Sequence, residues 1–88
     1  MKVVYDALFS DVARQHEEIV RLDGATLRGL IGALTERYGP GFGELVMDPQ
    51  GENTVPGVAI LVNGRRLALD SPLSDGDEVA FLRPIAGG

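Results

Sequence analysis

Hydrophobic and polar residues alternate at the start of the chain. Val3 and Tyr5 would share one face of an extended segment, and this period of two predicts a half-buried strand over residues 2–8. Residues 9–17 are mixed and mostly polar, which predicts a loop with a helical turn. The segment 18–22 predicts a second strand, which would pair with the first in an antiparallel hairpin.

The clearest helix lies in the middle of the chain. Thr26 is a suitable N-cap because its hydroxyl can accept from an unpaired amide of the first turn. Gly39 and Pro40 supply the stop. Gly29 and Gly32 lie inside the helix, each at a cost of about 1 kcal/mol relative to Ala. We therefore expect packing to hold it, through apolar residues that recur at helical spacing: Leu27, Leu30, Ile31, Leu34 and Tyr38.

Turn residues dominate much of the second half of the chain. Glycine and proline are frequent over residues 39–57, so we expect a long irregular connection with one short ordered piece at Leu45–Met47. A hairpin follows, in which Asn63-Gly64 joins a strand over 59–62 to a returning strand over 65–69. Asn-Gly favours a type I′ turn because both central positions need positive φ.

The last predicted strand is Glu78–Leu82. It follows turn residues at 70–77 and ends before Pro84, which has no N–H to donate to a ladder. The side chains of Val79 and Phe81 would point to one face of the sheet, and those of the alternate residues would point to the opposite face. Because one helix cannot cover both faces of a sheet, the order of elements predicts a two-layer α+β domain. One set of these side chains would lie in the core and the other on an open apolar face, which is typical of a partner surface.

Composition restricts the function classes. The 88 residues are enough for a single domain, which we assign to residues 1–84, followed by a flexible tail over 85–88. The net charge of -5 argues against nucleic-acid and anionic-membrane binding, which need clustered Lys and Arg. No cysteine is present to form a disulfide or a zinc–thiolate site, and no apolar run is long enough for a signal peptide or a membrane span. We expect a cytoplasmic protein.

Side chains suited to catalysis are scarce. His16 is the single histidine and lies in a polar stretch, so we interpret it as a solvated loop residue. Asp75-Gly76-Asp77-Glu78 lacks the spacing of a calcium loop and is explained by a turn. We therefore predict no metal site. Gly39–Gly43 is followed by no Lys-Ser/Thr pair of a phosphate-binding loop.

The C-terminus offers a different chemistry. A predicted strand ends at a proline and is followed by a short tail that finishes in Gly87-Gly88. A glycine pair has no side chains, so it can enter a narrow tunnel and adopt backbone angles closed to other residues. Such a tail could deliver the Gly88 carboxylate into the active site of another protein.

The segment Asp75–Gly88 resembles the C-terminus of the MoaD/ThiS-type ubiquitin-like sulfur carriers, most closely the small subunit of molybdopterin synthase. The shared pattern is an acidic turn, a Val-Ala-Phe strand, proline, an aliphatic residue, a small residue and Gly-Gly. Asn63-Gly64 and Ser71–Leu73 also match at similar places. The resemblance implies the β-grasp fold, a mixed sheet of four to five strands packed on one main helix.

The resemblance also implies a mechanism. An E1-like adenylating enzyme would use ATP to activate the Gly88 carboxylate, and a sulfur donor would then convert it to a thiocarboxylate. The recipient would be a larger synthase subunit or another sulfur-accepting enzyme, with no cofactor bound permanently by the carrier. Gly88 and Gly87 would carry the chemistry. Partner contacts would come from the segment that leads to these two glycines: Phe81, Leu82, Arg83, Pro84, Ile85 and Ala86. Within this segment, alternation favours a core position for Phe81.

The resemblance leaves the pathway open. Arg83 stands where proline is common in the molybdopterin group, and the connection over 39–57 resembles carriers outside the molybdenum pathway. Molybdopterin synthesis therefore competes with cysteine, thiamine, tungsten-cofactor and tRNA-thiolation pathways. A protein modifier conjugated through Gly88 and a plain β-grasp interaction domain are further alternatives.

Overall fold

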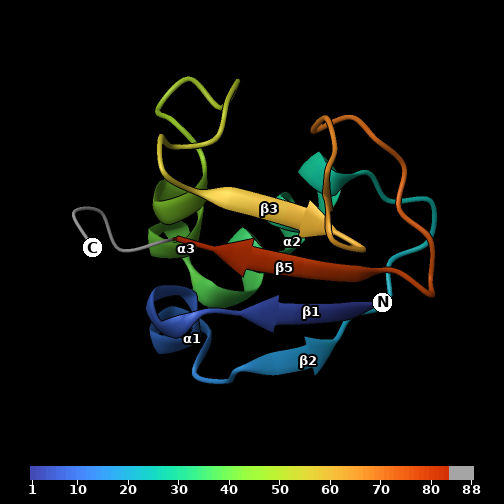
Figure 1. Cartoon of the computed structure of the whole chain (residues 1–88). Coiled ribbons are helices and arrows are strands. Elements are labelled where there is room, and N and C mark those ends of the chain that lie inside the picture. The colour runs from blue at the N-terminus through green and yellow to red at the C-terminus, as the bar shows by residue number, and fades with distance from the viewer. Residues whose placement is uncertain (84–88) are drawn as a thin grey trace.

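Five strands form one mixed sheet in the order β2-β1-β5-β3-β4 (Figure 1). The computed structural model describes residues 1–83 of the chain. β1 runs parallel to β5, and the other neighbouring pairs are antiparallel. The last strand therefore lies in the centre of the sheet. The strand bounds are β1 Lys2–Tyr5, β2 Glu17–Ile19, β3 Ala59–Val62, β4 Arg65–Arg66 and β5 Glu78–Leu82.

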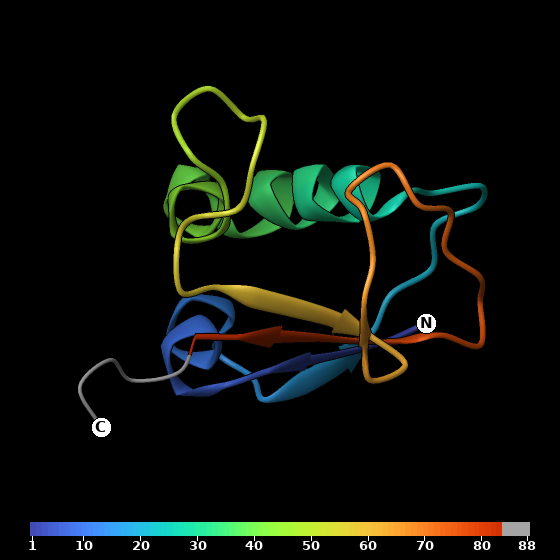
Figure 2. The same cartoon turned by 45° about the horizontal axis from the view of Figure 1, so that its top comes forward.

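Three helices accompany the sheet: α1 Ala7–Ala13, α2 Leu27–Tyr38 and α3 Pro40–Val46. Figure 2 shows α2 and α3 over one face of the sheet and α1 at the end where β1 stops. No helix of the described part of the chain covers the opposite face. This arrangement confirms the predicted two-layer α+β domain.

The core joins α2 and α3 to the sheet. The predicted alternation of β5 is confirmed, since Val79 and Phe81 are fully buried while Ala80 and Leu82 are partly exposed. The ring of Phe81 lies 5.5 Å from that of Phe42, centroid to centroid. The apolar stripe predicted for α2 is also confirmed, and Thr26 Oγ1 accepts from Gly29 N at 3.1 Å as its N-cap. Four residues of the stripe are buried: Leu27, Leu30, Ile31 and Leu34.

The prediction of a loop with a helical turn over residues 9–17 is only partly correct, because a regular helix, α1, begins at Ala7 and continues to Ala13. Asp6 caps this helix by accepting from Phe9 N, so β1 stops at Tyr5 rather than continuing to residue 8. Phe9 and Ala13 are four residues apart and both are buried. These two residues form the apolar face of α1. The pattern was hard to recognise in the sequence because most of the surrounding residues are polar.

The prediction of an irregular connection over residues 39–57 is wrong for the first third of that range. The stop after α2 is confirmed, but α3 starts at once, with Pro40 in its first turn, where a missing N–H costs nothing. Phe42 and Val46 lie four residues apart and are fully buried against the core. Two glycines inside α3 weakened its helical pattern in the sequence.

Two strands are shorter than predicted. Asn63 and Gly64 both have positive φ, 52° and 81°, which confirms the turn. The returning strand nevertheless ends at Arg66, because the chain then turns toward the start of α2, where Arg28 N donates to the Leu69 carbonyl at 2.8 Å. β2 ends at Ile19 instead of residue 22.

Gly32 and Gly43 provide a matched test of the helix packing. A Cβ at exposed Gly32 would meet no atom within 4 Å, so Gly32→Ala should raise the free energy of unfolding by about 0.5–1 kcal/mol. A Cβ at Gly43 would lie 3.0 Å from the Thr35 side chain, which is held by its hydrogen bond to the Ile31 carbonyl. Gly43→Ala should therefore give no gain. Urea titration checks both, and equal stabilisation of the two variants would contradict close packing of α2 on α3.

Candidate functional site

The centre of the site is the C-terminal end of β5. Leu82 is half-buried on the open face of the sheet and Arg83 is exposed, while Phe81 lies wholly in the core. Phe81 therefore packs in the core beneath the site and offers no surface to a partner. This agrees with the core position that the alternation of β5 favoured. The other predicted site residues lie outside the described residues: Pro84, Ile85, Ala86, Gly87 and Gly88.

One side chain fixes this end of β5. The Asp6 carboxylate accepts from Arg83 N at 2.5 Å through Oδ2 and from Phe9 N at 3.4 Å through Oδ1. The Asp6 main chain donates in turn to the Phe81 carbonyl at 3.1 Å. The last described residue before the tail is thus bound to the turn between β1 and α1. The sequence pattern predicts a strand through Asp6 and gives no signal of this role, because the bond joins residues far apart in the chain.

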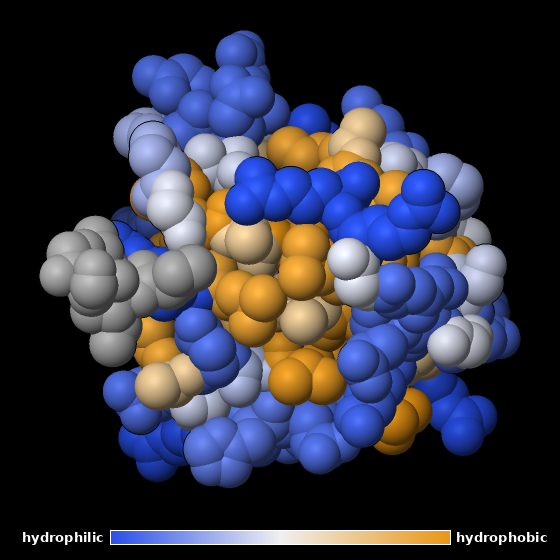
Figure 3. All heavy atoms as spheres, in the orientation of Figure 1, coloured by the Kyte–Doolittle hydropathy of each residue, from blue (hydrophilic) through white to orange (hydrophobic). Residues whose placement is uncertain are grey.

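The face of the sheet away from the helices is apolar at its centre. We call it the open sheet face. Paired residues lie on one side of a sheet, so the strand register determines its members. Figure 3 shows an orange hydrophobic area at the centre of this face with hydrophilic residues around it. The apolar members are Val4, Ile19, Ala59, Leu61, Ala80 and Leu82.

Charged residues border the open sheet face. Lys2 Nζ lies 3.2 Å from Glu17 and 3.7 Å from Glu78. The hydrogen bond to Glu17 and the charges of both carboxylates raise the pKa of the Lys2 ammonium. Arg66 pairs with Leu61 and lies on the same face. An apolar centre with a charged rim is the usual composition of a protein-binding surface.

A polar cluster on the helix side joins β1, β2 and α2. Glu18 accepts hydrogen bonds from the hydroxyls of Tyr5, at 2.6 Å, and Tyr38, and Arg37 Nη1 lies 2.9 Å from its other oxygen. Gln15 Nε2 donates to the Tyr38 hydroxyl at 2.6 Å. The Glu18 side chain is only 6% exposed, so these partners replace the hydrogen bonds that water would make to it. Among the described residues no buried polar side-chain atom lacks a hydrogen-bond partner, and in this cluster the partners come from its own members, which indicates a structural brace.

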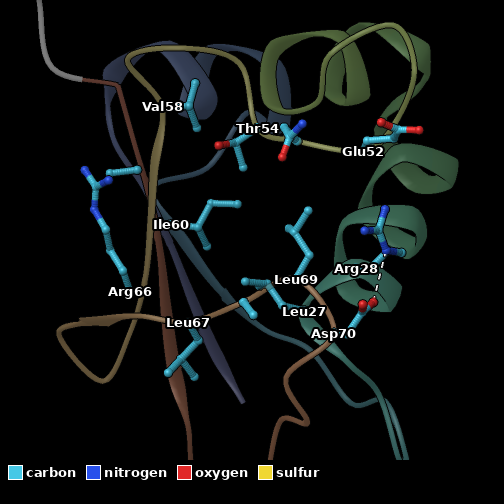
Figure 4. Close-up of a pocket in the computed structure, with 13 residues that line it drawn as sticks. Leu27, Arg28, Glu52, Thr54, Val58, Ile60, Arg66, Leu67, Leu69 and Asp70 are labelled. Carbon is cyan, nitrogen blue, oxygen red and sulfur yellow. Dashed lines mark hydrogen bonds and ion pairs between the residues drawn. The ribbon is translucent and has the colours of Figure 1, made fainter.

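A groove of about 440 Å³ lies between β3 and the start of α2 (Figure 4). Leu27, Ile60 and Leu69 give it an apolar lining, and Arg28 at its edge pairs with Asp70 at 3.3 Å. Arg28 also donates to the Gly51 carbonyl at 2.6 Å. None of the residues that line the groove is a histidine, serine or cysteine.

The acidic turn before β5 has a structural role. Asp77 accepts from Ser74 N and from Asn63 Nδ2, both at 2.8 Å, and these bonds lower the pKa of its carboxyl group. This confirms the interpretation of residues 75–78 as a turn. Among residues 1–83, no three His, Cys, Asp or Glu side chains are grouped closely enough to hold a metal ion. His16 is exposed, as expected of a loop residue.

A mixed sheet with its first and last strands parallel at the centre, packed on one main helix, is the β-grasp arrangement of ubiquitin-like proteins. The family model described as "ThiS family" matches residues 3–88. The chain belongs to this family of ubiquitin-like sulfur carriers and modifiers. Comparison with curated protein sequences gives no match.

Solved structures agree with this assignment. The chain is 29% identical to SAMP1 from Haloferax volcanii, with a TM-score of 0.85 over 100% of this chain and 98% of that one. It is 35% identical to a putative molybdopterin converting factor, subunit 1, from Pyrococcus furiosus, with a TM-score of 0.74 over 96% and 95%. For CysO from Mycobacterium tuberculosis the values are 27% and 0.79, over 96% and 98%.

The helices of the described residues are too short and too polar to cross a membrane.

The brace around Glu18 predicts a change of stability in alkali. Burial and then the hydrogen bond to Glu18 raise the pKa of Tyr5 above its ordinary value, and the same causes raise the pKa of Tyr38. The unfolded chain releases these protons near pH 10, before the folded protein does, so the free energy of unfolding should fall as the pH rises above about 10.

The variant Tyr5→Phe isolates the contribution of Tyr5. Each tyrosine can contribute a slope of at most about 1.4 kcal/mol per pH unit, so the variant should lose stability less steeply between pH 10 and 11.5. Urea unfolding at several pH values measures both slopes. Parallel curves for the two proteins would show that Tyr5 ionises normally in the folded state.

Proposed function

We propose that this protein is a sulfur carrier whose Gly88 carboxylate is adenylated by an E1-like enzyme and converted to a thiocarboxylate. The observation that carries the proposal is the central position of β5: the strand that leads to Gly87-Gly88 ends beside an apolar face that no described helix covers. Membership of the ThiS family supports the carrier role. Together these features suit a domain that docks on an enzyme and delivers its own C-terminus.

The chemistry explains why a partner is needed. A carboxylate is a poor electrophile because its leaving group would be oxide. Attack of a Gly88 oxygen on the α-phosphorus of ATP forms an acyl-adenylate and releases pyrophosphate. With hydrosulfide as the simplest donor, a C–S bond then forms as the bond between the acyl carbon and the phosphate oxygen breaks, and AMP leaves. The thiocarboxylate stores a nucleophilic sulfur for the recipient.

For the recipient we propose the larger subunit of molybdopterin synthase, in molybdenum-cofactor synthesis. The supporting observation is the similarity to a putative molybdopterin converting factor subunit, at 35% identity. The protein is also similar to CysO, at 27% identity, and cysteine synthesis is the competing destination that we propose. The activation step is common to both proposals, so it can be tested without choosing between them.

A second candidate function is conjugation to proteins. It is favoured by the similarity to SAMP1, which is described as small archaeal modifier protein 1. The same acyl-adenylate would then end in an isopeptide bond between Gly88 and a lysine amine. Affinity purification of tagged protein from cells, followed by a search for branched peptides, would separate a modifier from a carrier.

Intact-mass spectrometry tests the primary proposal. The purified chain is incubated with an E1-like enzyme, ATP and sulfide. We expect a mass gain equal to replacing one oxygen by one sulfur, located at Gly88 by fragmentation.

A chain without Gly88 and a reaction without ATP serve as the controls, and neither should change in mass. An unchanged mass of the full chain with several activating enzymes that thiolate their own carriers would overturn the thiocarboxylate proposal.

A further inference from the structure

The parallel pairing of β1 and β5 follows a regular pattern up to Asp6. Lys2 N donates to the Asp77 carbonyl at 2.9 Å and Asp6 N donates to the Phe81 carbonyl at 3.1 Å, four residues further along both strands. In a regular parallel ladder, the residue two positions after Phe81, directly beyond the end of β5, would next donate back to the first strand. That donor is Arg83 N, and its regular acceptor would be the Asp6 carbonyl.

The Asp6 carbonyl already has another partner. It accepts from Ser10 N at 2.8 Å, because α1 begins at Ala7 and its first turn uses this oxygen. Arg83 N donates instead to Asp6 Oδ2 at 2.5 Å. The carboxylate of Asp6 thus replaces the Asp6 carbonyl as the acceptor. It completes the last hydrogen bond between the two parallel strands, at the point where β1 has ended and α1 begins.

We propose that Asp6 is a positioning residue that fixes where the C-terminal segment leaves the sheet and so governs its presentation to the activating enzyme. The second part rests on the proposed function. A hydrogen bond to a charged acceptor is stronger than one between neutral groups, which suits a bond at an exposed strand end. With Arg83 held, five residues lie beyond it, and they can span at most about 18 Å.

Loss of this bond would free the end of β5. Each residue released from the sheet would add about 3.5 Å of reach and would have to be ordered again when the partner binds. The cost should appear as weaker binding of the carrier and not as slower chemistry, since Asp6 does not carry the reacting carboxylate.

The variant Asp6→Ser separates the two tasks of this side chain. Serine is a good N-cap, so α1 should persist. Its hydroxyl would lie near the position of the Asp6 Cγ, one bond short of the oxygen that accepts from Arg83 N. Thr26→Ala is the matched control, because it removes the cap at the start of α2, far from the C-terminal end of β5 (Figure 2).

Hydrogen exchange tests the first part of the proposal without any enzyme. We expect the Arg83 amide to exchange about tenfold or more faster in Asp6→Ser, relative to the slowest core amides, and to be unchanged in Thr26→Ala on the same scale. Equal exchange of Arg83 in the wild type and in Asp6→Ser would overturn the proposal.

Activation kinetics test the second part. With the E1-like enzyme and ATP, the KM for Asp6→Ser should rise about tenfold, with kcat within about twofold of the wild type, whereas Thr26→Ala should match the wild type. Arg83→Pro removes the N–H donor, and its KM should exceed that of Arg83→Ala, which loses the same side chain but keeps the donor.

The double variant Asp6→Ser, Arg83→Pro should be no worse than Arg83→Pro alone, because both changes remove one bond. Additive effects, or faster Arg83 exchange with unchanged kinetics in Asp6→Ser, would overturn the positioning role and leave the carrier function standing. Failure of the wild type to be activated would instead refute the proposed function, and the exchange experiment would still decide whether Asp6 fixes the strand end.

Discussion

The pairing of β5 between β1 and β3 is the constraint on which the rest of the structure depends. Through it Val79 and Phe81 enter the core, where Phe81 contacts Tyr5, Phe9 and Phe42. The same pairing brings Ala80 and Leu82 to the centre of the open sheet face. One strand therefore supports the core, forms the middle of the exposed apolar surface and leads to the C-terminal tail.

Two polar devices hold the edges of this arrangement. The Glu18 cluster ties β2 and α2 to β1, and burial of the Glu18 carboxylate is compensated by the two tyrosine hydroxyls and by Arg37. Asp6 ties the start of α1 to the end of β5. Both devices act on β1, the strand that runs beside β5, so the position of the last strand depends on residues near the start of the chain.

Sequence patterns predicted the parts of the fold in which one periodicity dominates. The stripe of α2, the Asn63-Gly64 turn and the alternation of β5 are confirmed because burial follows a regular repeat in each. The helices α1 and α3 were missed because each is only seven residues long and is held by two or three buried side chains. In such short helices tertiary packing outweighs local propensity.

The candidate site was predictable to a different degree. The surface position of Leu82 could be inferred from the sequence, since it depends on alternation. The role of Gly87-Gly88 stays a prediction, because both residues lie outside the described part of the chain. The role of Asp6 could not be inferred, because it arises where a strand becomes a helix beside a distant strand end. The groove beside α2 was also missed, since it forms between segments separated by a long connection.

We propose that the open sheet face and the end of β5 form one docking surface for the activating enzyme. NMR titration of the isotopically labelled protein with an E1-like enzyme tests it most directly. The largest changes in amide signals should occur at Ala59, Leu61, Ala80, Leu82 and Arg83, with little change around the groove at Thr54 and Leu69. Changes concentrated at the groove, with the open sheet face unaffected, would contradict this proposal.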